Sequence, residues 1–213
     1  MENNKNKYDL SIRNSVIAFP SLFRMTVIPG YEKSDPLYRV YFLLDKKTHL
    51  DTINKIKTIF QQLGAENNFK PTDKNTTCFR DGDELADEDI KNSVYRGYYR
   101  LFAKSGKTPQ GNIIVPHICK IKEGKAVSVL EEEGLIYGGA ICSGYVNFYC
   151  YGKTGTNKGI SCGLHTVLFN KHGSPLGAGA IDASSQFLDM GDSEEVVIPT
   201  NHENTAENEV DLF

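Results

Sequence analysis

Residues 139–169 read GAICSGYVNFYCYGKTGTNKGISCGLHTVLF. From Tyr145 to Tyr151, tyrosines and an asparagine alternate with smaller or apolar residues and one phenylalanine. Successive side chains of a strand point to opposite faces of a sheet, so this period of two is typical of a strand with one buried face. The pattern predicts two strands, Gly139–Tyr151 and Ile160–Phe169, joined by a glycine-rich turn.

Short runs rich in Tyr, Phe, Val and Ile lie between clusters of Gly, Pro, Asn and Asp through most of the chain. This composition is typical of strands, which we expect at Ser15–Phe19, Leu37–Leu44, Gly97–Lys104 and Ile113–Ile121. Only Thr48–Leu63 has apolar residues at helical spacings of three and four, with Thr48 and Asp51 as a predicted capping box and Gly64 at the end. We expect loops over Glu66–Asn75 and Asp81–Asn92.

About six strands with one helix favour a mainly β fold of OB type over a sandwich, because sandwiches rarely need a capping helix. We therefore predict a five-stranded Greek-key barrel with extra strands and one capping helix, followed by a disordered acidic C-terminal tail. With 213 residues, 39% of them hydrophobic, the chain can build one substantial core. The predicted domains are residues 1–191, the OB-fold domain, and residues 192–213, the tail.

The last twenty-two residues contain seven carboxylates and no lysine or arginine, and they end at Asp211-Leu212-Phe213. Removing these seven from the 27 acids leaves 20 against all 24 Lys and Arg, so a net charge of −3 divides into about +4 and −7. A terminal block of like charge is typical of a disordered interaction arm, and beside a basic body it indicates an imitation of a polyanion such as nucleic acid. The alternative is a terminus that only increases solubility.

Several classes of protein are disfavoured by the sequence. No apolar run approaches the ~20 residues of a membrane-spanning helix, and residues 1–5 lack the apolar stretch of a secretion signal, so we expect the protein in the cytoplasm. Five cysteines without a C-x-x-C pair predict buried, reduced thiols rather than disulfides or a zinc site.

The strongest binding pattern alternates cations with rings along one strand. At a period of two, one face of the segment carries Arg96, Tyr98, Arg100, Phe102 and Lys104, and Lys107 follows in the next loop. Cations neutralise phosphates and exposed rings stack on unpaired bases, so this face predicts binding of single-stranded nucleic acid. A solvated strand face is the structural alternative.

Two weaker sets extend the predicted site. Tyr145, Tyr149 and Tyr151 form an outward row that continues into Lys153 and Lys158, and Arg39 and Tyr41 lie on the outward side of another strand. The alternatives are tyrosines that cover a second layer of core and ordinary surface residues.

No group of residues predicts an active site. Gly152-Lys153-Thr154 and Gly106-Lys107-Thr108 lack the first glycine of a phosphate-binding loop, and neither the histidines nor the serines fit a metal or nucleophile motif. The acids of Asp81–Asp89 raise the alternative of a metal-dependent nuclease, but their spacing does not fit an EF-hand, and two-metal nucleases draw carboxylates from separate elements. We predict a protein that is not an enzyme and uses no cofactor or metal.

Several runs in order, among them Gly97–Ser105, Tyr137-Gly138-Gly139, Tyr145–Tyr151 and Asn157–Leu164, resemble the OB-fold single-stranded-DNA-binding proteins of tailed bacteriophages. The resemblance covers roughly residues 19–187. It implies a protein that coats and protects single strands without marked sequence preference during DNA replication, recombination and repair. It also implies that Asp211, Leu212 and Phe213 contact replication proteins such as a polymerase or helicase.

Two other hypotheses stay open at this point: a metal-dependent nuclease, and a virion or protein-interaction β domain in which the tyrosine rows pack against other subunits. The acidic arm could reach the predicted binding face of a neighbouring copy as easily as its own, which would allow a homodimer.

Overall fold

The computed structural model describes residues 6–72, 76–108, 110–152 and 158–176. Eight strands carry the fold: β1 (Asp9–Thr26), β2 (Leu37–Asp45), β3 (Phe79–Asp81), β4 (Tyr98–Ser105), β5 (His117–Lys122), β6 (Lys125–Ser128), β7 (Ile141–Tyr151) and β8 (Gly159–Lys171). The helical segments are α1 (Leu50–Glu66), α2 (Gly82–Glu88) and the short 3₁₀ turns η1 (Ile90–Tyr95) and η2 (Glu131–Glu133). The predicted acidic tail and Lys153 lie outside the described residues.

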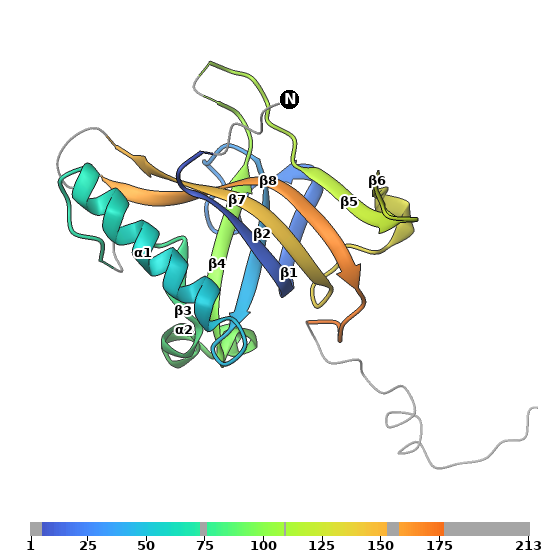
Figure 1. The fold of residues 1–213 in the computed structure, drawn as a ribbon, viewed down its shortest axis with the longest axis horizontal. Coiled ribbons are helices and arrows are strands. Elements are labelled where there is room, and N and C mark those ends of the chain that lie inside the picture. The colour runs from blue at the N-terminus through green and yellow to red at the C-terminus, as the bar shows by residue number, and fades with distance from the viewer. Residues whose placement is uncertain (1–5, 73–75, 109, 153–157, 177–213) are drawn as a thin grey trace, which may run out of the picture. The chain divides into compact units, whose positions relative to one another are not determined.

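Five strands close into a barrel in the order β4-β2-β1-β7-β8, and a parallel pairing of Lys104 in β4 with Gly163 in β8 completes the ring. The other neighbours in the ring are antiparallel. β3 adds to β4 at one edge, and the β5–β6 hairpin extends the sheet from β8 (Figure 1). The predicted OB-type barrel with extra strands is confirmed.

The barrel core follows from the alternation in the sequence. Val146 and Phe148 of β7 are buried inside, whereas Tyr145 and Tyr149, which flank this pair, lie on the outer face of the strand. Where β7 has Gly144, the ring of Phe42 from β2 fills the space, since an added Cβ would lie 2.4 Å from that ring. Close packing of this kind fixes which side chains face in.

Helix α1 caps this core, as predicted. Its buried face includes Ile53, Ile56 and Phe60, and the Phe60 ring lies 5.4 Å from that of Phe148. The predicted ends were wrong. Thr48 is not the N-cap, because its N–H donates to the Asp45 side chain in a preceding turn, and the helix runs past Gly64 to Glu66.

The acidic stretch predicted as a loop is largely helical, and that prediction was wrong. Asp81 ends β3 and caps α2 by accepting the N–H of Asp83 at 2.9 Å. Asp89 caps η1 by accepting the N–H of Lys91. Short acidic side chains at helix N-termini satisfy free backbone donors, so the carboxylates stabilise helical turns that the polar composition concealed.

Outside the barrel, α2 and η1 pack on the outer surface of β1 and β2. Leu85 and Tyr95 from this insertion bury Ala18 and Leu43 in a second, smaller cluster. Gly82 permits the close approach, since a Cβ there would lie 2.1 Å from the Tyr95 carbonyl oxygen. This small cluster determines how much of the outer surface stays open.

Of the five cysteines, four are buried and unbonded, as expected, while Cys150 is partly exposed. Burial raises the pKa of the Cys78 and Cys142 thiols to about 12. These thiols are therefore protonated and act as small apolar core residues. Within the described residues, none of the helices is both long and apolar enough to cross a membrane.

Candidate nucleic-acid interface

Strand β4 presents the predicted alternation. Leu101 and Ala103 are fully buried inside the barrel, and Arg100, Phe102 and Lys104 lie on the outside with partial exposure. Strand β2 lies alongside in register, so Arg39 is opposite Lys104 and Tyr41 is opposite Phe102. We call the outer surface formed by Arg39, Tyr41, Arg100, Phe102 and Lys104 the cationic-aromatic face.

The rings of this face are packed together. The centroids of Tyr41 and Phe102 are 4.9 Å apart with planes inclined by 30°, and the Arg100 guanidinium lies over the Tyr41 ring at 5.1 Å. Tyr41 thus contacts both groups from the centre of the cluster. Phe102 and Lys104 extend the face along β4 away from the insertion.

Arg100 marks the border between the covered and the open surface. Its guanidinium lies 5.3 Å from the Tyr95 ring, and its Nε is buried without a hydrogen-bond partner in the described part of the chain. Burial raises the pKa of Tyr95, and the charge of Arg100 opposes that rise. Arg80 of β3 is paired with Arg100 across the two strands and forms an ion pair with Glu88 at 3.3 Å.

Two members of the predicted face are placed elsewhere. Arg96 lies in the turn before β4, where it pairs with Asp87 at 3.0 Å. Tyr98 points outward, but it packs against the cluster of Leu43, Leu85 and Tyr95 beneath the insertion. Arg96 therefore precedes the strand, and Tyr98 is partly covered because α2 and η1 fold back over this end of β4. Nucleic-acid binding by these two residues stays a prediction.

At the end of β4 and in the loop after it lie two hollows, both lined by Lys104, Lys107 and Tyr149. One, of about 250 Å³, opens toward Pro36 and Leu37 at the start of β2. The other, of about 320 Å³, opens toward Ile114, Asn147 and His165. Tyr149 is 40% exposed and so presents part of its ring to this region.

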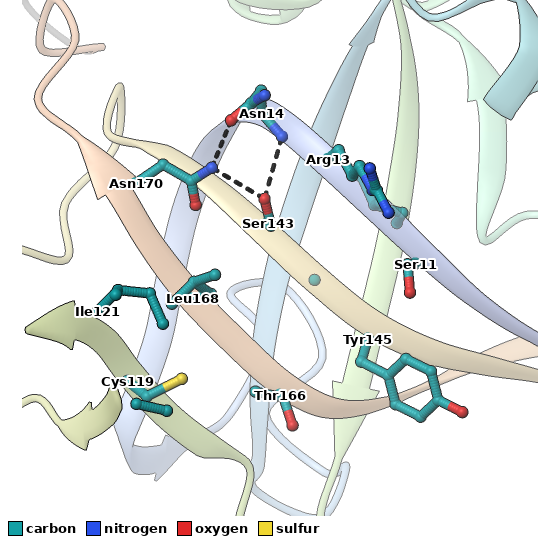
Figure 2. A pocket seen from close by; sticks show the side chains of 13 residues that line it. Ser11, Arg13, Asn14, Cys119, Ile121, Ser143, Tyr145, Thr166, Leu168 and Asn170 are labelled. Carbon is teal, nitrogen blue, oxygen red and sulfur yellow. Dashed lines mark hydrogen bonds between the residues drawn. The ribbon is translucent and has the colours of Figure 1, made fainter. Parts of the chain in front are cut away.

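The tyrosine row of β7 divides between two regions. Tyr149 and Tyr151 are exposed, whereas the Tyr145 hydroxyl donates to Asp9 at 2.7 Å, a bond that raises the pKa of Tyr145. Tyr145 lines a different hollow on the outer surface of β1, β7 and β8, together with Arg13 and Leu168 (Figure 2). A carboxylate at this position disfavours a nearby phosphate.

The cations of the predicted site differ in whether they already have a partner in the fold. Arg100, Lys104 and Lys107 have no ion pair with any described residue, and Arg39 donates only to the carbonyl of Thr26 at 3.2 Å. Lys158, by contrast, donates to the carbonyl of Asn67 at 2.7 Å, which ties the start of β8 to the end of α1. A cation without an acidic partner can neutralise a phosphate without first breaking an internal pair.

The acidic stretch is engaged with the fold. Asp81 and Asp83 both accept from Lys46, at 2.5 and 2.7 Å, while Asp87 and Glu88 pair with arginines. No cluster of His, Cys, Asp or Glu suited to a metal ion occurs in the residues that the structure describes. In this arrangement the carboxylates hold α2 against the barrel.

A sequence profile of the family described as Enterobacter phage Enc34, ssDNA-binding protein, matches residues 9–197. The chain belongs to this family. The description of the family names binding of single-stranded DNA. None of the curated proteins compared with the chain matches it.

Solved structures of phage proteins share the fold. The single-stranded DNA-binding protein of bacteriophage Enc34 in complex with ssDNA superposes with a TM-score of 0.65 at 19% identity, over 81% of this chain and 91% of that one. A C-terminal truncation of the Enc34 protein gives 0.64 at 20% identity, over 80% and 90%. Bacteriophage T7 gp2.5, a single-stranded DNA-binding protein, gives 0.54 at 14% identity, over 83% and 97%.

Within the Enc34 family fold, three residues near the cationic-aromatic face had not been predicted. Phe19 and Tyr95 lie 6.2 Å from the Tyr41 ring, and Arg80 is opposite Arg100. Phe19 was the last residue of a predicted strand, and nothing in its local pattern distinguishes it. Tyr95 and Arg80 reach the face only through the packing of the insertion and of β3.

Proposed function

We propose that the chain is a phage single-stranded-DNA-binding protein that coats and protects unpaired strands during DNA replication, recombination and repair. The observation that carries this proposal is the position of the cationic-aromatic face. In OB folds the second and third barrel strands and the adjoining loops bind oligonucleotides. Here these strands are β2 and β4, and their outer surface carries rings beside cations that have no acidic partner among the described residues.

Each residue type has a distinct role in this proposal. Arg39, Lys104 and Lys107 neutralise phosphates, and the released counterions provide most of the free energy of binding. Phe102 and Tyr149 stack on bases, each stacked base contributing ~1–3 kcal/mol. Because every base has a π face, binding of this kind shows little preference for sequence.

The two hollows beside Lys104 extend the proposed path of the strand. They continue the cationic-aromatic face past the end of β4 toward Tyr149 of β7, so a strand that leaves Phe102 reaches a second ring. Tyr151 lies two positions farther on the same face of β7 and is also exposed. Arg96, Tyr98, Tyr145 and Lys158 are not needed in this path.

The acidic arm has a separate proposed role. Asp211, Leu212 and Phe213 end a segment of net charge −7, which suits contact with basic and apolar surfaces of a polymerase or helicase. In the absence of DNA the same charges compete for the cationic-aromatic face of this copy or of a second copy in a homodimer. The proposed setting is the host cell cytoplasm, without a cofactor.

A salt-dependent titration of the full chain, comparing single-stranded with duplex DNA, tests the proposal. We expect the single strand to bind more tightly, with log affinity falling linearly with log salt. Lys104→Ala combined with Lys107→Ala should reduce the slope by about 1.4, since each phosphate contact contributes ~0.7. Tyr149→Ala should reduce affinity about 5- to 150-fold and leave the slope unchanged.

The matched control removes two exposed lysines near α1, Lys47 and Lys55, and should leave the slope unaltered. No retention of oligonucleotides at low salt would contradict the proposal and favour a protein-interaction domain. Cleavage of labelled single strands in the presence of magnesium or manganese would favour the nuclease alternative.

A further inference from the structure

The backbone of Phe19 adopts a conformation that a phenylalanine rarely takes. Its φ is +47°, in the left-handed region where a bulky side chain is an outlier. It also precedes Pro20, whose ring favours extended backbone with negative φ in the preceding residue. Of the three other described non-glycine residues with positive φ, two are asparagines, which tolerate this region, and the third, Glu123, lies in a tight turn beside Gly124.

Burial of the side chain does not offset this strain. Phe19 is 52% exposed, the aromatic contacts given for it being with Tyr41 and Tyr95, at centroid distances of 6.2 and 6.3 Å. A phenylalanine half in water gains only part of the free energy of full burial. The strained backbone at Phe19 therefore coincides with a ring that is half exposed.

Neighbouring backbone holds this conformation in place. The residue lies in an irregular part of β1, where the register with β2 shifts between Ala18 and Ser21. On the other side, Gly139 donates to the carbonyl of Ile17 at 2.8 Å, and the N–H of Ile17 donates to Ala140 at 3.0 Å. Strain that is held by surrounding hydrogen bonds is a recurrent property of binding sites.

The position of the ring indicates what it does. Ala18, next to Phe19, is opposite Tyr41 in β2, and Tyr41 is opposite Phe102 in β4. Rings therefore stand on three adjacent strands at the surface where the unpaired cations lie. Neighbouring strands are ~4.8 Å apart, so an unpaired strand that crosses them meets successive rings.

We propose that Phe19 is a base-stacking residue, and that it extends the binding site from β2 and β4 to β1. The proposal rests on the proposed function, since it requires that single-stranded DNA binds the cationic-aromatic face. In this proposal the strained backbone of Phe19 positions its ring for the base next to the one at Tyr41.

Phe19→Gly tests this inference because glycine adopts positive φ without strain. We expect the affinity of the full chain for a poly(dT) oligonucleotide to fall about 5- to 150-fold, with an unchanged salt slope and with a Tm that is unchanged or higher. Phe19→Tyr restores an aromatic ring and should bind within about threefold of the unaltered chain. Ile90→Ala, at a residue 78% exposed on η1, is the matched control for loss of an exposed apolar group.

Each outcome is decisive. Equal affinities of Phe19→Gly and the unaltered chain would overturn the inference, as would a loss of affinity that Phe19→Tyr shares. A loss of affinity accompanied by a lower Tm, with no recovery in Phe19→Tyr, would assign Phe19 a structural role instead. If the unaltered chain itself retains no oligonucleotide, the proposed function fails rather than the role of Phe19.

Discussion

Arg100 makes ring contacts that a lysine at the same position could not reproduce with a planar group. Its planar guanidinium stacks between the rings of Tyr41 and Tyr95, at 5.1 and 5.3 Å, and its charge has no acidic partner within the described residues. Stacking of this kind contributes roughly 0.5–1 kcal/mol per ring at exposed sites. The side chain thus packs between the two rings, and in the proposed function its charge neutralises a phosphate.

Replacing Arg100 by glutamine removes the charge and keeps most of the volume. If the guanidinium neutralises one phosphate, the slope of log affinity against log salt should fall by about 0.7 on a single strand. Arg96→Gln, which removes a cation already paired with Asp87, is the control and should alter the slope much less. Equal changes in the two variants would argue against a direct phosphate contact by Arg100.

The sequence could predict which way Arg100, Phe102 and Lys104 point, because alternation along a strand is a local property. It could not predict that Tyr98, on the same face, is covered. The cover comes from α2 and η1, which pack against β1 and β2 as well as Tyr98. Those strands are far from Tyr98 in the sequence, so a local pattern cannot reveal the contact. Phe19 was missed for a similar reason, since its exposure arises from an irregularity in β1 that composition does not reveal.

At the scale of elements, α1 and the strands β2, β4, β7 and β8 were predictable from periodicity. Only residues 15–19 of the much longer β1 were predicted, and the helices of the acidic insertion were not. Its carboxylates act as helix caps and as partners of Lys46, which requires knowledge of contacts across the fold. Burial raises the pKa of Asp81, but the hydrogen bond and charge of Lys46 and the hydrogen bond from the Asp83 N–H together outweigh it, so the pKa lies below its usual value. The bonds from Lys46 and the Gly97 N–H likewise lower the pKa of Asp83.

Lys46→Met should therefore reduce stability in a way that depends on pH. A carboxyl whose pKa is depressed by folding stabilises the fold above its unfolded pKa, near 4, and this contribution is lost as the pH falls through the lower, folded pKa. We expect the variant to be less stable than the unaltered chain by about 1–2 kcal/mol near pH 7. The difference should shrink below about pH 4.

Urea unfolding at several pH values, followed by circular dichroism, measures this difference. Lys47→Met is the matched control, because Lys47 is an exposed neighbour without an ion pair in the described parts of the chain. A loss of stability in Lys46→Met that is the same at neutral and acid pH would show that packing, not charge, connects the insertion to the barrel.

Across the whole molecule, charge is distributed far from evenly. Residues 1–191 hold all 24 Lys and Arg against 20 acids, and residues 192–213 hold seven acids alone. If the net charge of −3 were spread evenly over the protein, it would repel a polyanion such as DNA at low salt. The same charges divided as about +4 and −7 allow DNA to bind the basic part once the acidic part is displaced or screened.

Deleting residues 192–213 changes the net charge from −3 to +4 and should tighten binding of single-stranded DNA at low salt. The gain should diminish as salt rises, because the Debye length falls from ~30 Å at 0.01 M to ~3 Å at 1 M. A full-length variant with its seven tail acids changed to Asn or Gln separates charge from bulk, since it keeps the length and Phe213. Tighter binding in both variants would show that the carboxylates compete with DNA, whereas unchanged or weaker binding in the deletion would exclude inhibition by the tail. Tighter binding in the deletion alone would mean that the arm obstructs the face by its volume.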